Sequence, residues 1–597
     1  MGDPIKRVER RSKRAIFSAF LSRARKSGGA TVALIDGDGK EFTFKELTRA
    51  AFALGGAMAR KMAKKERVGI LLPTSAGALI SFFALLSRGR VPAMLNFTSG
   101  ARNLLLACKT AEVSRIITAK KFIELANLQD LIDELSQAVD IIYLEDLRGE
   151  LTRRDKVLAV LGPYLPKLLA AQPHYDEPGV ILFTSGTEGT PKGVVLSHRN
   201  IIANTEQISA HVDLLPSDVF FNPLPTFHCY GLTAGSLWPI LNGHRVVLHP
   251  SPLQTKIIPK RILETGSTVL FATDTFLSQY MRASADGAMS SLRISVCGAE
   301  RVRDETRAAA LRRFGFEVLE GYGVTEGSPV LAANQPGDIR SGTVGRLLPG
   351  VEARLEPVEG LENAGRLHVR GPNIMKGYIT ADEPGVIKPL EDGWHDTGDV
   401  VAINDEGYVS IRGRLKRFAK IGGEMVSLAV VENCASAVWP DNLHAAAILP
   451  DARKGEQIIL VTDCCSAPRD LLLAWAQSHG VAELAVPKKI ICVNEMPVQG
   501  TGKINFLAVK TLAEEGLEAL AKAKETPQPE PSKRELKKRA AQERDEQKRA
   551  EREAKATEKA AAGVAEKAAA KDQTVENGPG PKAANDDTDD VNKDAAE

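Results

Sequence analysis

Between residues 31 and 412 the chain alternates short apolar runs with longer amphipathic runs. The short runs are rich in β-branched residues and are typical of buried strands, as in RVGILLP (67–73) and TVLFAT (268–273). The longer runs, such as FKELTRAAFALGGAMARKM (44–62), have the spacing of helices that cover a sheet. This alternation predicts an α/β fold with layered sheets and helices in a large N-terminal domain.

Composition divides the rest of the chain into three parts. Residues 413–525 combine strand-like and helical runs, which suits a small α+β C-terminal domain, whereas residues 526–597 are a charged, low-complexity tail. Residues 1–30 form a basic amino-terminal arm with two interpretations. The arm is either solvated, or it lies on an anionic membrane surface with four apolar side chains facing the lipid: Ile16, Phe17, Phe20 and Leu21.

Charge and cysteine content narrow the class of protein. The 597 residues carry 78 basic and 75 acidic side chains, a net charge of +3 that does not indicate a nucleic-acid partner. The seven cysteines include no C-x-x-C pair, which predicts reduced thiols. The most apolar segment, 78–87, is much shorter than the about 20 residues that span a bilayer. We therefore expect a cytoplasmic protein, peripheral at the inner face of the cell membrane if the basic arm binds lipid.

A glycine- and hydroxyl-rich loop interrupts two apolar runs in VILFTSGTEGTPKGVVLSH (180–198). Glycines let the backbone approach a ligand closely, and clustered N–H groups, hydroxyls and a lysine suit phosphate oxygens. The loop is not a Walker P-loop, because Pro191 occupies the place of the required second glycine. A surface loop of the same composition is the alternative. The residues that would bind phosphate are Thr184, Ser185, Gly186, Thr187, Gly189 and Lys192.

Four further motifs follow in a fixed order. GYGVTEGSP (321–329) places an aromatic ring, a hydroxyl and a carboxylate in one turn, and GWHDTGDV (393–400) presents two aspartates. GRLKRFAKIGGEMVS (413–427) is basic and glycine-rich, and PVQGTGKIN (497–505) places Lys503 in a flexible loop. Each motif alone is a weak signal, whereas all of them in this order are a strong one.

With these motifs the chain resembles the adenylate-forming superfamily of acyl-CoA synthetases, luciferases and peptide-synthetase adenylation domains. The resemblance covers residues 31–525. Within the superfamily the chain is most similar to the acyl-[acyl-carrier-protein] synthetase part of the bacterial bifunctional 2-acylglycerophosphoethanolamine acyltransferases. Stretches such as LPTFHCYGLTAGSLWPIL (224–241) and GPNIMKGY (371–378) favour that subfamily. No histidine is followed by Asp in the H-x-x-x-x-D pattern of the acyltransferase part, which predicts a stand-alone synthetase.

The resemblance implies an ATP- and Mg²⁺-dependent enzyme that works in two half-reactions. A fatty acid carboxylate attacks the α-phosphate of ATP to give acyl adenylate and pyrophosphate, and a pantetheine thiol then displaces AMP. The basic run from Arg412 to Lys420 favours acyl carrier protein, which is acidic, as the acceptor, and coenzyme A is the alternative. A non-catalytic adenylate-binding scaffold is a further alternative. An α/β-hydrolase is excluded by the absence of a G-x-S-x-G motif.

The resemblance also implies a role for each motif residue. The phosphate loop would hold the β- and γ-phosphates, Tyr322 would stack on adenine, and three residues would line the other side of the ring: Gly298, Ala299 and Glu300. Asp399 and Arg414 would hold the ribose. Glu326, beside Thr325, would bind Mg²⁺, and His228 would lie near the substrate carboxylate. For the small domain, which rotates in this superfamily, Lys416 would be the hinge and Gly422 and Gly423 would face the pantetheine tunnel.

Lys503 would stabilise the charge that develops between carboxylate and α-phosphate in the first half-reaction. Lys503→Ala should therefore abolish pyrophosphate formation but leave thioester synthesis from preformed acyl adenylate intact. Both half-reactions can be measured separately, by pyrophosphate release and by thioester yield. Equal loss of the two would contradict this role for Lys503.

Overall fold

The computed structural model describes residues 3–185, 190–359, 361–421, 424–451, 455–498 and 504–525. The chain divides into two units, Met1–Leu517 and Glu518–Glu597, and the fold below is that of the first unit. Among the described residues, none of the helices combines the length and apolar character needed to cross a bilayer.

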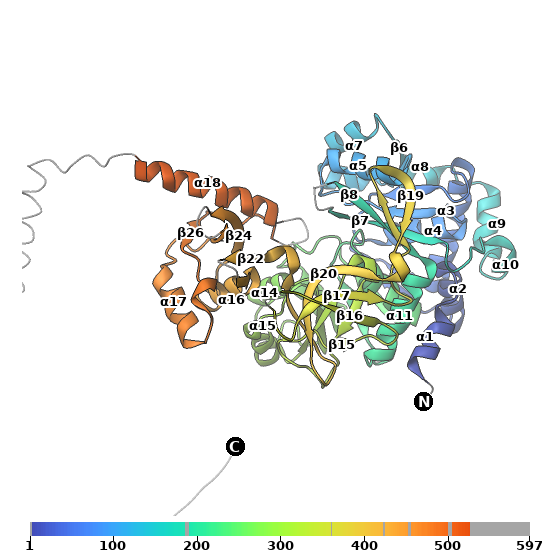
Figure 1. The fold of residues 1–597 in the computed structure, drawn as a ribbon. Coiled ribbons are helices and arrows are strands. Elements are labelled where there is room, and N and C mark those ends of the chain that lie inside the picture. Colours follow the sequence, from blue (N-terminus) through green and yellow to red (C-terminus); the bar gives the residue numbers. More distant parts are fainter. Residues whose placement is uncertain are drawn as a thin grey trace, which may run out of the picture. The chain divides into compact units, whose positions relative to one another are not determined.

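A nine-stranded sheet forms one layer of the large domain (Figure 1). Its strands, in spatial order, are β15 (Arg346–Leu347), β14 (Val330–Ala333), β13 (Glu317–Gly323), β12 (Ile294–Cys297), β11 (Val269–Ala272), β9 (Val219–Asn222), β10 (Arg245–Leu248), β1 (Val32–Ile35) and β2 (Glu41–Thr43). The strands from β13 to β1 are parallel, and antiparallel strands close both edges. The predicted buried strand at 268–273 is β11.

An eight-stranded sheet forms the second layer. Its strands, in spatial order, are β19 (Glu383–Pro389), β18 (Gly377–Thr380), β8 (Pro191–Ser197), β7 (Pro178–Ser185), β4 (Val91–Met94), β3 (Arg67–Ile70), β5 (Arg115–Thr118) and β6 (Asp140–Tyr143). The half from β7 to β6 is parallel, and the other half is antiparallel. The phosphate-loop motif thus lies where the sheet changes from parallel to antiparallel pairing.

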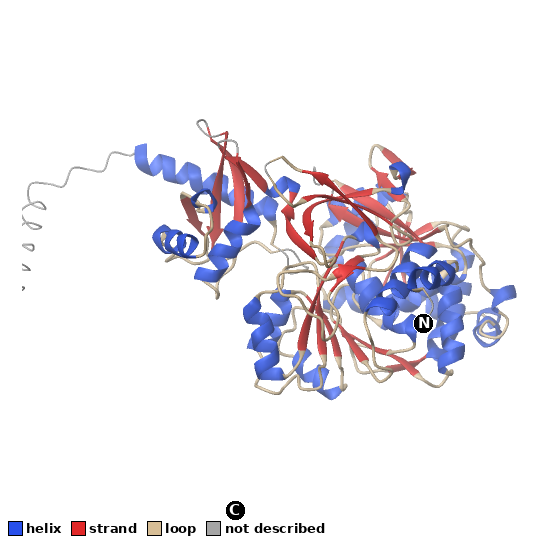
Figure 2. Ribbon diagram, turned by 60° about the horizontal axis from the view of Figure 1, so that its bottom comes forward, coloured by secondary structure: helices blue, strands red, loops and turns tan. Residues whose placement is uncertain are grey.

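Helices pack on the faces of these sheets, and α11 contacts strands of both, β7 and β8 of one sheet and β14 of the other (Figure 2). They are α1 (Pro4–Ser12), α2 (Ile16–Ser27), α3 (Phe44–Lys61), α4 (Ala76–Ser87), α5 (Ala101–Ala111), α6 (Lys120–Leu125), α7 (Gln129–Leu135), α8 (Leu144–Gly149), α9 (Arg153–Leu161), α10 (Pro166–Leu169), α11 (His198–His211), α12 (Trp238–Asn242), α13 (Ile258–Glu264), α14 (Asp274–Arg282) and α15 (Asp304–Ala309). The apolar segment 78–87, too short to span a bilayer, is part of the buried helix α4. One core cluster contains residues of both large sheets, such as Val194 and Val247, and so joins the two layers.

A four-stranded antiparallel sheet completes the large domain, with β16 (Glu352–Pro357), β17 (Gly365–Arg370), β20 (His395–Ile403) and β21 (Val409–Arg414). The short helical turns of the first unit are η1 (Tyr230–Leu237), η2 (Ala310–Phe314), η3 (Thr325–Gly327), η4 (Glu391–Gly393), η5 (Leu415–Arg417) and η6 (Glu483–Ala485).

The C-terminal part after Arg414 has its own sheet and its own apolar cores, as expected for an α+β domain. Its elements are β22 (Phe418–Ile421), β23 (Glu424–Ser427), α16 (Leu428–Val438), β24 (His444–Asp451), β25 (Gly455–Thr462), α17 (Arg469–Ser478), β26 (Lys489–Cys492) and α18 (Phe506–Glu525). Cys465 and Cys492 form a disulfide here, so the prediction of reduced thiols is wrong for these two residues. Pairing of β25 with β26 brings together cysteines that are 27 residues apart in sequence.

The amino-terminal residues are not a separate arm, which corrects both interpretations given to residues 1–30. They form α1 and α2, and the four side chains expected to face lipid are buried in the main core: Ile16, Phe17, Phe20 and Leu21. The ring of Phe20 stacks on that of Phe83 in α4, with 4.2 Å between centroids. A basic helix with one apolar face fits a protein core as well as it fits a membrane, so its sequence pattern did not separate the two.

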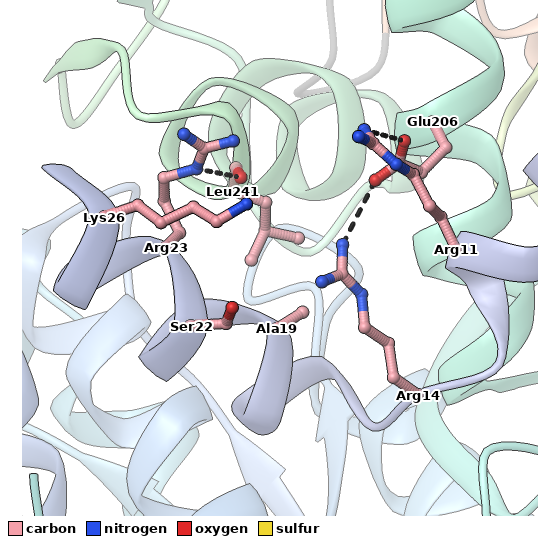
Figure 3. Close-up of a pocket in the computed structure, with 8 residues that line it drawn as sticks. All are labelled: Arg11, Arg14, Ala19, Ser22, Arg23, Lys26, Glu206 and Leu241. Carbon is pink, nitrogen blue, oxygen red and sulfur yellow. Dashed lines mark hydrogen bonds and ion pairs between the residues drawn. The ribbon is translucent and has the colours of Figure 1, made fainter. Parts of the chain in front are cut away.

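Ion pairs complete the attachment of these helices (Figure 3). The Glu206 carboxylate in α11 accepts hydrogen bonds from Arg11 and Arg14, at 3.1 Å each. Arg23 Nε donates to the carbonyl oxygen of Leu241 in α12 at 2.9 Å. Part of the basic charge of the amino terminus is therefore used inside the fold.

Phe20→Ala tests this attachment. Removing a fully buried aromatic side chain should lower the free energy of unfolding by about 3–5 kcal/mol, measured by urea denaturation. Ile5→Ala is the control, because Ile5 is 53% exposed in the neighbouring helix, and it should change stability by less than about 0.5 kcal/mol. Equal, small effects of both substitutions would restore the solvated-arm interpretation.

Candidate active site

The phosphate-loop motif forms the tip of an antiparallel hairpin. Strands β7 and β8 pair so that Thr184 lies opposite Lys192, and Ser185 is the last residue of β7. Three predicted loop residues, Gly186, Thr187 and Gly189, lie outside the described residues. Two paired apolar strands thus flank the polar residues of the motif.

Tyr378 connects this hairpin to Glu326. The Lys192 ammonium lies 5.6 Å from the centre of the Tyr378 ring, within the range of a cation–π contact. The Tyr378 hydroxyl donates a 2.6 Å hydrogen bond to Glu326 Oε1. Lys192 forms no ion pair with the described residues. Because Glu326 lies in η3 between β13 and β14, this contact joins the two large sheets.

Gly377 fixes the position of Tyr378. Its φ is 154°, and a Cβ atom there would lie 1.9 Å from the carbonyl oxygen of Lys388 in the paired strand β19. Only glycine fits, so the KGY sequence sets both the strand pairing and the direction of the tyrosine. Thr325 and Glu326 share the turn that faces it, where the Met375 N–H donates to the Glu326 carbonyl oxygen at 2.8 Å.

Asp399 forms a second cluster, on β20 of the four-stranded sheet. Its Oδ2 accepts a 2.5 Å hydrogen bond from the Tyr322 hydroxyl, and its Oδ1 pairs with Arg414 Nε at 2.8 Å. Each carboxylate oxygen is engaged once and keeps another lone pair, which fits two ribose hydroxyls. The predicted ribose pair, Asp399 and Arg414, is therefore in direct contact, and the predicted adenine-stacking residue Tyr322 adjoins it.

The loop after β12 contains the three residues predicted to line adenine. Gly298 packs against the Tyr230 ring, since a Cβ at Gly298 would lie 3.4 Å from it. Ala299 has a positive φ of 70°, and Glu300 Oε2 accepts a 3.0 Å hydrogen bond from the Thr275 N–H. The loop is thus fixed by its neighbours, and a Cβ at Gly298 would lie 3.6 Å from the carbonyl oxygen of Gly321, the residue before Tyr322.

His228 lies just before η1, with its ring 4.8 Å from that of Phe227. The adjacent Cys229 is buried, which raises the pKa of its thiol to about 12, and the charge of Glu326 adds to the shift. The segment that carries His228 therefore lies within electrostatic range of Glu326. Lys416 lies exposed in η5, whereas Gly422, Gly423 and Lys503 lie outside the described residues.

Sequence reasoning missed Tyr378. It belongs to the stretch GPNIMKGY, which supported the resemblance but received no role. A tyrosine 52 residues from its hydrogen-bond partner gives no local signal, and only the pairing of β18 with β8 brings it to Lys192.

Burial and charge set the protonation of the site. Burial raises the pKa of the Tyr378 hydroxyl above its usual range, and Glu326 raises it further, so Tyr378 stays a hydrogen-bond donor. Burial also raises the pKa of the Asp399 carboxyl, whereas Arg414 and the Tyr322 hydroxyl oppose that increase. The charge of Glu326 also raises the pKa of the Asp399 carboxyl, which places the two carboxylates in one electrostatic site.

The donor set fits a nucleotide with Mg²⁺ rather than a resident metal. Within the described ranges, no three His, Cys, Asp or Glu side chains converge on one metal position. Mg²⁺ in nucleotide sites is held by one or two carboxylates together with substrate phosphates and water. Glu326, whose Oε1 is held by Tyr378, is the residue that would supply such a carboxylate, and bound Mg²⁺ would neutralise phosphate charge.

A layered α/β domain with this cluster of Lys, Glu, Asp and Tyr side chains defines a nucleotide-binding enzyme. Residues 20–379 match the family model of the AMP-binding enzymes, and the chain belongs to that family. It is an AMP-forming acid–thiol ligase that uses ATP and Mg²⁺.

Known proteins resemble most of the chain. The medium-chain fatty-acid–CoA ligase of Escherichia coli (strain K12) is 28% identical over 509 residues, 81% of this chain and 88% of the ligase. The feruloyl-CoA synthase of Amycolatopsis sp is 30% identical over 501 residues, 81% of this chain and 96% of the synthase. Among solved structures, ATP-bound MatB from Rhodopseudomonas palustris has a TM-score of 0.71 at 24% identity, covering 83% of this chain and 98% of MatB. The similarity to MatB, at this identity, shows a shared fold only.

Tyr378→Phe tests the link between Tyr378 and Glu326. The ring and its contact with Lys192 remain, but Glu326 loses its hydrogen bond, which is worth about 1.5–3 kcal/mol for a charged group. Pyrophosphate release should fall roughly tenfold and require more Mg²⁺ for half-maximal rate.

Tyr408→Phe is the matched control, because the Tyr408 hydroxyl donates to Asp338 Oδ2 at 2.7 Å. It removes a tyrosine–carboxylate hydrogen bond that involves none of the site residues. If both variants show the same Mg²⁺ dependence, Tyr378 does not position Glu326.

Proposed function

We propose that the chain activates a fatty acid as acyl adenylate and transfers the acyl group to coenzyme A. The observation that supports this most directly is the connection of Lys192, Tyr378 and Glu326 across two sheets. A cation for the leaving phosphates and a carboxylate for Mg²⁺ are what the first half-reaction needs.

The fatty acid is the proposed acid because a medium-chain fatty-acid–CoA ligase is among the relatives. Three apolar side chains would suit an acyl chain, and all three are buried in the main core. They are Phe227, Leu232 and Phe276, which are 4%, 0% and 1% exposed. Feruloyl-CoA synthase, a relative at 30% identity, is named for an aromatic acid, so the test must include one.

Coenzyme A is the proposed acceptor because both of these relatives are named for it. Acyl carrier protein is the second candidate, and its proposed docking surface is the basic run from Arg412 to Lys420. Three of its cations are already paired: Arg414 with Asp399, Arg417 with Glu432 and Lys420 with Glu359.

Two cations of that run stay available. Arg412 and Lys416 are exposed and form no ion pair within the described part of the chain. Two cations suit the phosphates of coenzyme A as well as an acidic protein, so the charge alone favours neither.

The remaining roles are proposals on the same basis. Lys192 and the hairpin loop would hold the pyrophosphate end of ATP, and Asp399 with Arg414 would hold the ribose beside Tyr322. His228 would lie near the reacting carboxylate. Lys503 would serve the first half-reaction, and rotation at Lys416 would bring Gly422 and Gly423 to the thiol for the second.

A thiol competition tests the acceptor. The full chain is incubated with ATP, Mg²⁺ and a panel of medium- and long-chain fatty acids plus ferulate, with either coenzyme A or acyl carrier protein, and AMP and thioester are measured. We expect AMP and acyl-CoA with fatty acids. Preference for acyl carrier protein would contradict coenzyme A as the acceptor, and preference for ferulate would contradict a fatty acid as the substrate. Failure to form AMP with any acid would favour a non-catalytic scaffold.

A further inference from the structure

An outward-facing apolar surface covers α9, α10 and the turn between them. Six large side chains within twelve residues are 43–78% exposed, and we call this the α9–α10 face: Val157, Val160, Leu161, Tyr164, Leu165 and Leu168. Soluble proteins seldom gather so many exposed large apolar side chains in one short segment, and such patches mark interaction sites.

The side of α9 opposite this face packs against α3, and that contact fixes how the helix is turned. The buried Asp155 accepts hydrogen bonds from Arg60 of α3, at 2.8 and 2.7 Å. A Cβ atom at Gly162 would lie 2.5 Å from the Phe52 ring, so the helix end is pressed against α3 as well. Asp155 and Gly162 therefore fix the inward side of α9.

The apolar spacing runs along the opposite side. Positions 157, 160 and 161 follow the i, i+3, i+4 pattern that usually marks the side of a helix packed on a core, and Tyr164 continues the apolar run in the turn after α9. Here that stripe faces away from α3, and both ribbon views draw α9 and α10 at the edge of the large domain (Figures 1 and 2). No described residue covers the stripe, which leaves it open to an apolar partner.

The charges around the stripe identify the kind of partner. Four cations in the same segment are exposed and form no ion pair with any described residue: Arg153, Arg154, Lys156 and Lys167. Asp155 is the only acidic residue from 153 to 168, and it is buried against Arg60. The surface thus combines exposed apolar side chains with unneutralised positive charge.

We propose that the α9–α10 face binds the surface of an anionic phospholipid bilayer. Apolar side chains would enter the boundary between headgroups and acyl chains, and the cations would contact anionic headgroups. A second copy of the chain fits less well, because a two-fold interface through this face would bring the four cations of each copy together. The proposal goes beyond the ligase reaction, since lipid binding requires neither ATP nor a fatty acid.

Vesicle co-sedimentation of the full chain tests the proposal. Vesicles of phosphatidylcholine mixed with phosphatidylglycerol should bind the chain, more strongly at low salt than at high salt, and vesicles of phosphatidylcholine alone should bind it at least tenfold more weakly. Equal binding to both kinds of vesicle, or to neither, would overturn the proposal.

Paired variants assign the binding to this face. Leu165→Gln with Leu168→Gln should lower the partition coefficient at least tenfold. The matched control is Leu253→Gln with Leu311→Gln, two leucines that are 62% and 60% exposed elsewhere in the chain, and it should bind like the unchanged protein. Equal losses in the two double variants would overturn the assignment.

A second set of variants tests whether the positive charges of the α9–α10 face contribute to lipid binding. Lys156→Gln with Lys167→Gln should weaken binding to phosphatidylglycerol vesicles roughly tenfold, whereas Lys256→Gln with Lys260→Gln, at two exposed lysines outside the face, should not. Ligase activity with detergent-dispersed fatty acid should be unchanged in all variants, which separates lipid binding from the proposed function. If sedimentation velocity shows a dimer that Leu165→Gln with Leu168→Gln converts to monomer, and no vesicle binds, the face is a self-interface and the proposal is wrong.

Discussion

The hydrogen bond from Tyr378 to Glu326 is the interaction on which the site depends. Tyr378 belongs to the eight-stranded sheet, Glu326 to the turn between β13 and β14 of the nine-stranded sheet, and the bond between them joins the two. Through its ring Tyr378 also contacts Lys192 of the phosphate-loop hairpin. Lys192 and Glu326 are therefore held near each other although they come from different layers.

The Asp399 cluster is built on a third sheet, and a buried apolar cluster joins that sheet to β13 and β14 of the nine-stranded sheet. Tyr322, at the end of β13, donates to Asp399 in β20, so the nine-stranded and four-stranded sheets share this hydrogen bond. Charge of Glu326 acts on Asp399 as well. A nucleotide that spans both clusters would interact with all three sheets at once, which couples its binding to the packing of the whole large domain.

Much of the fold follows from local sequence pattern, because the strands of parallel sheets are short apolar runs and α3 and α4 have clear helical spacing. The hairpin, the Asp399–Arg414 pair and the Glu326 turn also lie in contiguous motifs that could be recognised. Tyr378 was missed because its role arises only from strand pairing across the chain. The amino terminus was misjudged for a related reason: an apolar face such as that of Phe17 and Phe20 shows that a helix has a partner, but not whether the partner is core or lipid.

Pyrophosphate exchange in the absence of any thiol tests the central claim most directly. If Lys192, Glu326 and Asp399 form a site for adenylation, the unaltered chain should incorporate labelled pyrophosphate into ATP, and the exchange should depend on both fatty acid and Mg²⁺. Exchange measures the first half-reaction alone, so it is independent of the acceptor. No exchange without thiol, at acid and Mg²⁺ concentrations that support thioester formation, would contradict the account.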